Sequence, residues 1–209
     1  MTETQGKILD TAERLFGEQG YAATSLRQII AEAGVNLAAI HYHFGSKEEL
    51  LDELIMRKAA PVNEERLALL NRFEAEAGSG PVPVEKILQA FLQPPFLRMN
   101  SSPRLLKLMG RMYGEGLMPL IVEKHFQSIV TRFLAAFGRA LPRLTPAELA
   151  LRMQFLAGAM AHTMFIGGTS LMPNTAPTDG AVLLRELVVF LSGGLRAPSV
   201  LAECVEESK

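Results

Sequence analysis

This chain of 209 residues has almost no cysteine and no large excess of charge of either sign. Cys204 is the only cysteine, which excludes an intramolecular disulfide bond and a zinc site made of several thiolates. The formal net charge is −1, so any contact with nucleic acid must come from a local surface rather than from the chain as a whole. The polar segment Met1–Lys7 has no apolar run, so we read no signal peptide and expect a cytoplasmic protein.

Aromatic anchors are scarce as well, and this weighs against a membrane span. Met153–Met172 is almost uncharged and near the ~20 residues that cross a bilayer. Tryptophan is absent from the chain, no tyrosine flanks this segment, and His162 lies in its middle. We therefore expect a helix that is buried on all sides, in a core and a subunit interface, and no membrane contact.

Strand-like alternation is missing, whereas apolar residues with a period of 3.6 recur from end to end, so the predicted fold is all-α with about nine helices. Ser46–Glu49 and Thr145–Glu148 have the pattern of capping boxes at helix starts. Proline bends or breaks helices, so the helix that starts at Val84 should be bent or broken at Pro94-Pro95. Further helices are expected at about 46–73, 118–141, 145–167 and 179–195.

Residues 24–47 carry the most informative pattern. Two short helices are joined by Ala33-Gly34-Val35-Asn36, a tight turn of the helix-turn-helix type. A solvated helix would show Lys and Glu on its surface, but the second helix presents small, apolar and aromatic side chains. Such side chains suit the major groove, where Ala and Leu contact thymine methyl groups. This outward set comprises Leu37, Ala38, Ala39, His41, Tyr42 and His43.

The local charge also fits DNA. Glu32 is the only acid between residues 24 and 47, against Arg27, Lys47 and two histidines. Hydroxyls, an imidazole and helix N-terminal amides would then supply most of the phosphate contacts. The histidines are not read as a metal site, because side chains two apart on a helix point about 200° apart. The expected phosphate contacts are Thr24, Ser25, Tyr42, His43 and Lys47.

The segments Phe16-Gly17-Glu18-Gln19-Gly20-Tyr21, Thr24-Ser25, Ala33-Gly34-Val35 and Tyr42-His43-Phe44-Gly45-Ser46-Lys47 resemble the signature of the TetR family. The resemblance covers about residues 5–55. It implies a three-helix DNA-binding domain, a divergent ligand domain and a homodimer made by the last two helices. Carried over by position, it assigns the bases to Leu37, Ala38, Ala39 and His41, and the phosphates to Thr24, Ser25, Arg27, Tyr42, His43 and Lys47.

Two positions depart from the family pattern. The family usually has Tyr at the position of His41 and often Gly at that of Ala38, so the operator sequence cannot be taken from a relative. We place the DNA-binding domain at residues 1–48, the ligand-sensing and dimerisation domain at 49–198, and a frayed tail at 199–209. Repression, rather than activation, follows from the resemblance alone.

A narrower resemblance connects the segment 35–47, together with Leu151-Arg152-Met153, Phe155 and Gly158-Ala159, to the PsrA-like, fatty-acid-responsive branch of the family. The second half of the chain is rich in Met and Phe, which suit flexible apolar guests but also fill ordinary cores. The expected effector is apolar, a long-chain fatty acid or an acyl-CoA. Its expected walls are Phe91, Phe96, Met99, Met109, Met112, Phe126 and Met153.

The helix near residues 153–172 and the final helix are expected to form a four-helix dimer interface. Small residues on the first would allow close approach, and an apolar stripe on the second would pack against it. The expected interface residues are Ala157, Gly158, Ala161, Leu184, Leu187, Val188 and Leu191.

Two other classes of protein were weighed. An enzyme is disfavoured because the chain has no phosphate-binding loop, no nucleophile elbow, no paired cysteines and no convincing pair of carboxylates. No cofactor and no metal are expected. A structural DNA-binding protein without a ligand remains open, and a ligand screen by thermal shift would separate it from a ligand-gated regulator.

Overall fold

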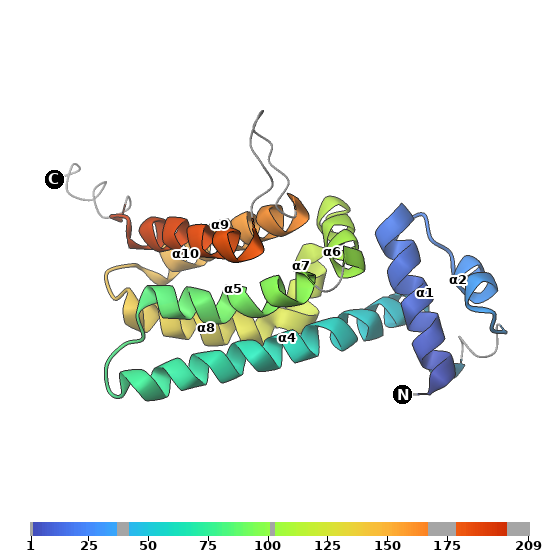
Figure 1. Ribbon diagram of the computed structural model, residues 1–209, viewed down its shortest axis with the longest axis horizontal. Coiled ribbons are helices and arrows are strands. Elements are labelled where there is room, and N and C mark those ends of the chain that lie inside the picture. The colour runs from blue at the N-terminus through green and yellow to red at the C-terminus, as the bar shows by residue number, and fades with distance from the viewer. Residues whose placement is uncertain (1, 37–41, 101–102, 167–178, 200–209) are drawn as a thin grey trace, which may run out of the picture. The chain divides into compact units, whose positions relative to one another are not determined.

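The computed structural model of the chain describes residues 2–36, 42–100, 103–166 and 179–199 (Figure 1). Across these ranges the chain is helical and contains no β-strand, which confirms the predicted fold class. No helix formed by these residues has the length and apolar character needed to cross a membrane. The elements are α1 (Glu3–Gln19), α2 (Leu26–Ala33), α4 (Lys47–Ala77), α5 (Val84–Asn100), α6 (Pro103–Gly114), α7 (Met118–Ile121), the π-helical turn η1 (Val122–Phe126), α8 (Gln127–Ala140), α9 (Pro146–Ile166) and α10 (Gly180–Arg196).

Local hydrogen bonds and turns mark the ends of α2 and the start of α4. The Ser25 hydroxyl accepts from the Gln28 amide at the start of α2, and Gly34 ends this helix with φ of 66°. A positive φ suits glycine because it has no Cβ. At the start of α4 the Ser46 amide donates to Glu49 Oε2 (3.0 Å) and the Glu49 amide to Ser46 Oγ (3.1 Å), so the capping box is confirmed.

The chain divides into two compact units. We call residues Met1–Val62 and Arg98–Gln127 unit 1, and residues Asn63–Leu97 and Ser128–Lys209 unit 2. Residues 98–127 belong with the N-terminal helices because α1 packs against α6. The functional division at residue 48 concerns DNA binding rather than compactness, and it stays a prediction.

The core of unit 1 is built by α1, α2, the start of α4, α6 and α7, and the contact of α1 with α6 is visible in Figure 1. Ile8 and Phe16 of α1, Ile29 of α2 and Leu50 of α4 are fully buried, as is Leu108 of α6. Each of these helices therefore has one apolar side turned to the same cluster, which holds the helix-turn-helix in a defined shape.

The core of unit 2 is built by the second half of α4 together with α5, α8, α9 and α10. Phe133 and Phe137 of α8 are completely buried, and the Phe133 ring meets Phe91 of α5 edge to face with 5.0 Å between the ring centres. Leu187 and Leu191 attach α10 to this cluster.

Of the two alternatives predicted at Pro94-Pro95, a break is wrong, because α5 continues through both prolines. A proline lacks the N–H that would donate to the carbonyl four residues earlier, so Pro95 leaves the Phe91 carbonyl without its helical donor. That carbonyl accepts instead from Nε of Arg66 on α4, at 2.8 Å. The replacement donor from another helix compensates for one of the two lost bonds.

Two further boundaries differ from the sequence predictions. Helix α4 reaches Ala77 rather than Phe73, and it ends at Gly78 with φ of 61°. The helix expected over 118–141 is divided into α7, the π-helical turn and α8. In that turn Lys124 and His125 both contact the carboxylate of Asp52, His125 with Nε2 at 2.9 Å. A widened turn with a specific contact is a typical use of π-helical geometry.

Candidate DNA-binding interface

The angle between α1 and α2 is held by polar contacts as well as by the core. Arg14 contacts both Glu18 on its own helix and Glu32 on α2. Gln19 Nε2 donates to Gln28 Oε1 at 2.8 Å. The Arg14 guanidinium holds the pKa of the Glu32 carboxyl below its usual range. Glu32, the only acid of the 24–47 segment, is therefore neutralised by a cation within the same unit.

Thr24 and Ser25, both predicted phosphate contacts, lie at the start of α2 in different environments. Thr24 is 2% exposed, and its hydroxyl donates to the Gly20 carbonyl at 2.7 Å while it accepts from Gln19 Nε2. In this conformation the Thr24 hydroxyl closes the turn between α1 and α2. Ser25 is exposed at the N-terminus of α2, where its hydroxyl proton and the first amides can meet an anion. Arg27, two residues on, is exposed too.

Tyr42 and His43 come at the end of the segment expected to read DNA. The Tyr42 side chain is 85% exposed, and its ring meets His43 edge to face with 5.0 Å between centres. Leu37, Ala38, Ala39 and His41, the predicted base contacts, lie outside the described residues, so their roles stay predictions. Because the Tyr42 ring is 85% exposed, it is not part of the buried core, which fits the predicted phosphate contact of Tyr42.

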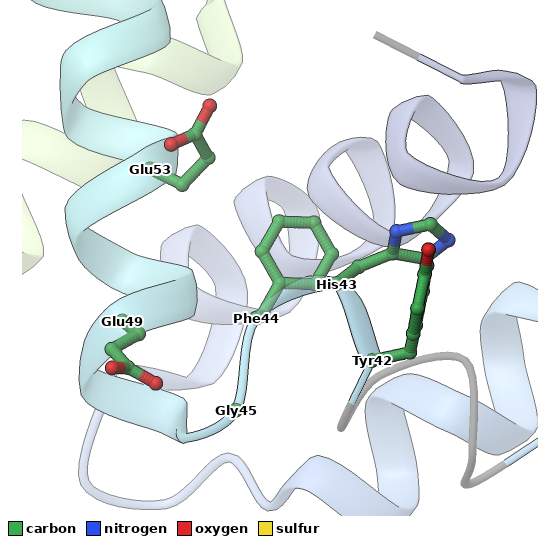
Figure 2. A pocket seen from close by; sticks show the side chains of 6 residues that line it. All are labelled: Tyr42, His43, Phe44, Gly45, Glu49 and Glu53. Carbon is green, nitrogen blue, oxygen red and sulfur yellow. The ribbon is translucent and has the colours of Figure 1, made fainter.

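A hollow of about 340 Å³ lies next to these rings, lined by Phe44, Gly45 and the α4 carboxylates Glu49 and Glu53 in addition to Tyr42 and His43. Figure 2 shows the two carboxylates projecting from α4 while the rings of Tyr42 and His43 lie together on the other side of Phe44. Two acids repel phosphate, so the hollow is unsuited to the DNA backbone. Among the residues that can be placed, no three His, Cys, Asp or Glu side chains gather to hold a metal.

Lys47 begins α4 and is half-buried, with Nζ 4.2 Å from the centre of the Tyr21 ring. A cation over an aromatic face is held without being neutralised. The Tyr21 hydroxyl donates to Glu48 at 3.2 Å, and burial, followed by the charge of Glu48, raises the pKa of Tyr21 to about 12. Tyr21 therefore holds the Lys47 ammonium in place and stays protonated at neutral pH.

Glu115 is a functional candidate that the sequence did not reveal. Its carboxylate, just after α6, accepts from the backbone amides of Tyr21 (3.0 and 3.1 Å) and Ala22 (3.2 Å) in the α1–α2 turn. Nearby, Arg111 donates to the Glu18 carbonyl at 3.1 Å. Gly20 has φ of 93°, a backbone conformation that side chains with a Cβ rarely adopt, so the turn needs glycine there. No sequence signal links residues so far apart along the chain.

The residues predicted to line a ligand pocket do not form one cluster. Phe91, Phe96 and Met153 belong to the core of unit 2. Met112 and Phe126 belong to the core of unit 1, and Met109 is half-buried in the same unit. The side chain of Met99 lies outside what the structure describes. The pocket stays a prediction, and the three residues in unit 2 are its most compact part.

The residues predicted for a dimer interface fall into two groups, one packed in the chain's own core and one exposed or half-buried. Leu187 and Leu191 are buried in the chain's own core, with Leu184 and Val188 packed against it. Ala157 is exposed, and Gly158 and Ala161 are half-buried. Large apolar side chains that were not predicted for the interface are exposed on α9 and α10: Leu151 (50%), Phe155 (63%), Val182 (37%), Val189 (65%) and Phe190 (73%).

Comparisons with known proteins agree with this geometry. Residues 8–54 match the model of the bacterial regulatory proteins of the tetR family, and residues 89–194 match that of the tetracyclin repressor-like C-terminal domain. The HTH-type transcriptional regulator AcrR of Shigella flexneri is 38% identical over 74 residues, 35% of this chain and 34% of that protein. The regulator BetI of Rhizobium meliloti is 26% identical over 190 residues, 91% of this chain and 88% of that protein.

Among solved structures, the fatty acid degradation regulator FadR of Bacillus halodurans shares the fold. Its TM-score is 0.69 at 18% identity, with 95% of this chain and 99% of that chain covered. The chain spans only about a third of the length of AcrR, so what these relatives do as whole proteins is not transferred with the match. The narrower resemblance to the PsrA-like branch stays a prediction.

The second family model alone covers half of the chain, and the first covers the helix-turn-helix whose caps, turn and exposed Tyr42 are described above. This chain belongs to the TetR family and is a transcriptional regulator that binds DNA through its N-terminal helix-turn-helix.

Proposed function

We propose that this regulator binds a palindromic operator as a homodimer, represses transcription there, and is released by an apolar effector that binds within unit 2. Two faces that stay exposed when a single chain folds support this proposal. One is the exposed polar and aromatic face of the helix-turn-helix, with Ser25, Arg27 and Tyr42. The other is the apolar face of α9 and α10. Action on an operator places the protein in the cytoplasm.

The homodimer is supported by the apolar face on α9 and α10. Phe155 and Phe190 are 63% and 73% exposed, and Val189 is 65% exposed. These two helices pack against each other, and exposed apolar patches mark interfaces in soluble proteins. A symmetric dimer would bury it, and a stable one should bury more than about 1,200 Å² in total. The two recognition helices would then enter major grooves about 34 Å apart, which requires a palindromic site.

The dimer is tested by charge on the exposed face. Phe155→Glu with Phe190→Glu should give a folded monomer that no longer binds operator, because two carboxylates would be buried at the interface. The control is Leu120→Glu, which adds one carboxylate at a 66% exposed leucine of unit 1. Sedimentation velocity measures the mass. A wild-type chain that sediments as a monomer at micromolar concentration would contradict the proposal.

An apolar effector is supported by the composition of the core of unit 2, where Phe91, Phe96, Phe133 and Met153 gather and Met160 and Met164 pack at the edge. Unbranched thioether side chains adapt to a flexible guest. Each buried methylene contributes roughly 0.8 kcal/mol, so a chain of about ten can offset the cost of immobilisation. One solved neighbour regulates fatty acid degradation, so long-chain acyl compounds are the first class to test.

Release requires that the effector bind the two conformations of the dimer with different affinity. The experiment starts with selection of operator sequences from random DNA by the purified protein. Oleate and oleoyl-CoA are then titrated against the labelled operator complex by fluorescence polarisation. We expect release at micromolar concentration. If a polar metabolite releases DNA and neither acyl compound does, the effector class is wrong. If nothing releases DNA, the protein is a DNA binder without a ligand.

A further inference from the structure

Arg66 is a buried cation in the middle of α4, and it is only 4% exposed. Its Nε donates to the Phe91 carbonyl (2.8 Å), its Nη1 to Asn63 Oδ1 (3.1 Å), and its Nη2 lies 3.8 Å from the sulfur of Met160. The guanidinium carbon also lies 4.3 Å from the centre of the Phe91 ring. Burial lowers the pKa of Arg66 to about 10, which still leaves the side chain protonated at neutral pH.

The hydrogen-bond partners of Arg66 are all neutral, whereas several other arginines of unit 2 contact carboxylates. Arg132 and Arg139 both contact Glu74, and Arg196 pairs with Glu85. Among the described residues no carboxylate lies within ion-pair distance of Arg66, and burial alone accounts for the shift of its pKa. A buried charge normally has a counter-charge, because removing it from water is costly. Arg66 is more deeply buried than these arginines, yet no carboxylate among the described residues pairs with it.

The position of Arg66 is set by the proline pair in α5. Pro95 cannot donate to the Phe91 carbonyl, so that carbonyl holds Nε of Arg66 from the neighbouring helix. With Nε held, the planar guanidinium presents Nη1 and Nη2 in a fixed orientation. Each of these nitrogens carries two N–H groups but has one partner among the described residues. Paired N–H groups at this spacing match the two oxygens of a carboxylate or phosphate.

Nη2 of Arg66 faces the thioether of Met160, an acceptor that a ligand could displace. Met160 is half-buried at the edge of the core, and its thioether is a weak acceptor. Its unbranched side chain can change rotamer without moving the backbone. Met164, one turn later on α9, is also half-buried, whereas Phe91, Phe133 and Leu156 are buried in the core of unit 2. Displacement of Met160 would expose a cation at the end of an apolar environment.

We propose that Arg66 is the anchor for the anionic head of the effector, a carboxylate or phosphate on an otherwise apolar molecule, which displaces the thioether of Met160. The inference rests on the proposed function, because it names the chemistry of the effector that unit 2 binds. The uncompensated charge then acts as a selectivity device: an apolar molecule with a neutral end leaves Arg66 unpaired, and one with an anionic end pairs with it.

The alternative role of Arg66 is purely structural, as a tie between α4 and α5. The two roles differ in what Arg66→Met should do. A structural tie predicts unchanged head-group preference. An anchor predicts loss of the preference for anions. Thermal stability does not separate the two roles, because Arg66→Met removes a buried charge but also leaves the Phe91 carbonyl without its donor.

The experiment measures binding of dodecanoate, dodecyl phosphate and dodecanol to the full-length protein by calorimetry, below the concentrations at which they form micelles. The wild type should bind one of the anions about tenfold or more tightly than the alcohol, and the tighter of the two identifies carboxylate or phosphate. Arg66→Met should abolish this difference and leave dodecanol binding unchanged. The matched control is Arg72→Met on the same helix, whose arginine is 60% exposed and should not matter.

Pro95→Ala is a second variant that leaves the charge in place. It restores an N–H to the Phe91 carbonyl, which then competes with Arg66, so anion preference should fall while the net charge is unchanged. Equal binding of anions and alcohol by the wild type, or full anion preference in Arg66→Met, overturns the inference. Release of operator that is equal in wild type and Arg66→Met overturns the anchor but leaves the regulator intact. Arg66-dependent binding without release supports the anchor and contradicts the proposed function.

Discussion

The two units use charge in opposite ways. In unit 1, charged groups join helices: Arg14 contacts Glu32 across the α1–α2 turn, and Glu115 accepts from two backbone amides of that turn. In unit 2, ion pairs also join helices near the surface, but the deepest cation, Arg66, has only neutral partners. A helix-turn-helix that must hold its shape on DNA gains from satisfied contacts. In the proposed sensor core, the charge of Arg66 offers an ion pair that an incoming anion can complete.

Loss of packing in the core of unit 2 should give the largest effect. Phe133→Ala removes a completely buried ring and should lower the free energy of unfolding by about 3–5 kcal/mol. Urea unfolding followed by circular dichroism measures it. Leu120→Ala, at a 66% exposed site of unit 1, should change the same quantity by less than about 0.5 kcal/mol. Similar values for the two variants would show that the cluster around Phe133 is not the main source of stability in unit 2.

Base recognition should respond next. His41→Ala should change which half-site is preferred, with about 1–3 kcal/mol of discrimination, because an imidazole that contacts a base edge is lost. Lys47→Ala should instead weaken all sequences alike and lower the salt slope of binding by about one unit. Selection from random DNA with each variant measures both. An unchanged ranking of operators for His41→Ala would show that this side chain does not contact the bases.

The tie made by Glu115 should have a smaller effect. Glu115→Ala removes the acceptor of the Tyr21 and Ala22 amides and should destabilise the α1–α2 turn by about 1.5 kcal/mol. Hydrogen exchange by NMR should show faster exchange at these two amides and unchanged rates in α10. Glu123→Ala, an exposed acid of the π-helical turn, is the matched control. Unchanged exchange at Tyr21 and Ala22 would show that the carboxylate does not hold the turn.

The surface pair of Glu85 with Arg196 should give the smallest effect. The Arg196 guanidinium lowers the pKa of Glu85 from 4.5 to about 2. A lowered pKa in the folded state contributes stability above the unfolded value and loses it as pH falls from about 4.5 towards 2. Both side chains are more than 40% exposed, so solvent screening limits the contribution to less than about 1 kcal/mol.

Melting temperatures of wild type and Glu85→Gln across this pH range test the pair. The difference between the two proteins should be present at neutral pH and shrink as the pH falls towards 2, because the wild-type carboxyl becomes protonated as the pH passes through its folded-state pKa. A difference that grows as the pH falls would have the wrong sign for an ion pair and would assign the shift of the Glu85 pKa to another cause.

Short-range patterns in the sequence determined the family, the all-α fold and most helix ends. Gly34, Ser25 and the Ser46–Glu49 box act over a few residues, so their hydrogen bonds follow from spacing alone. The predicted break at Pro94-Pro95 failed because a donor from α4 was invisible in the sequence. Leu187 was assigned to a dimer interface from its stripe, but an apolar stripe does not reveal whether it meets its own chain or a partner.

Only the tertiary structure decided the environment of the charged groups. Arg66 reads as a solvated helix residue, and its burial depends on α5 and α9, which lie far along the chain. Glu115 meets the amides of Tyr21 and Ala22 only because α6 packs against α1. Propensity and capping are properties of a few adjacent residues, whereas desolvation and ion pairing depend on every element that folds around a group. The physical range of each interaction therefore sets what the sequence alone could determine.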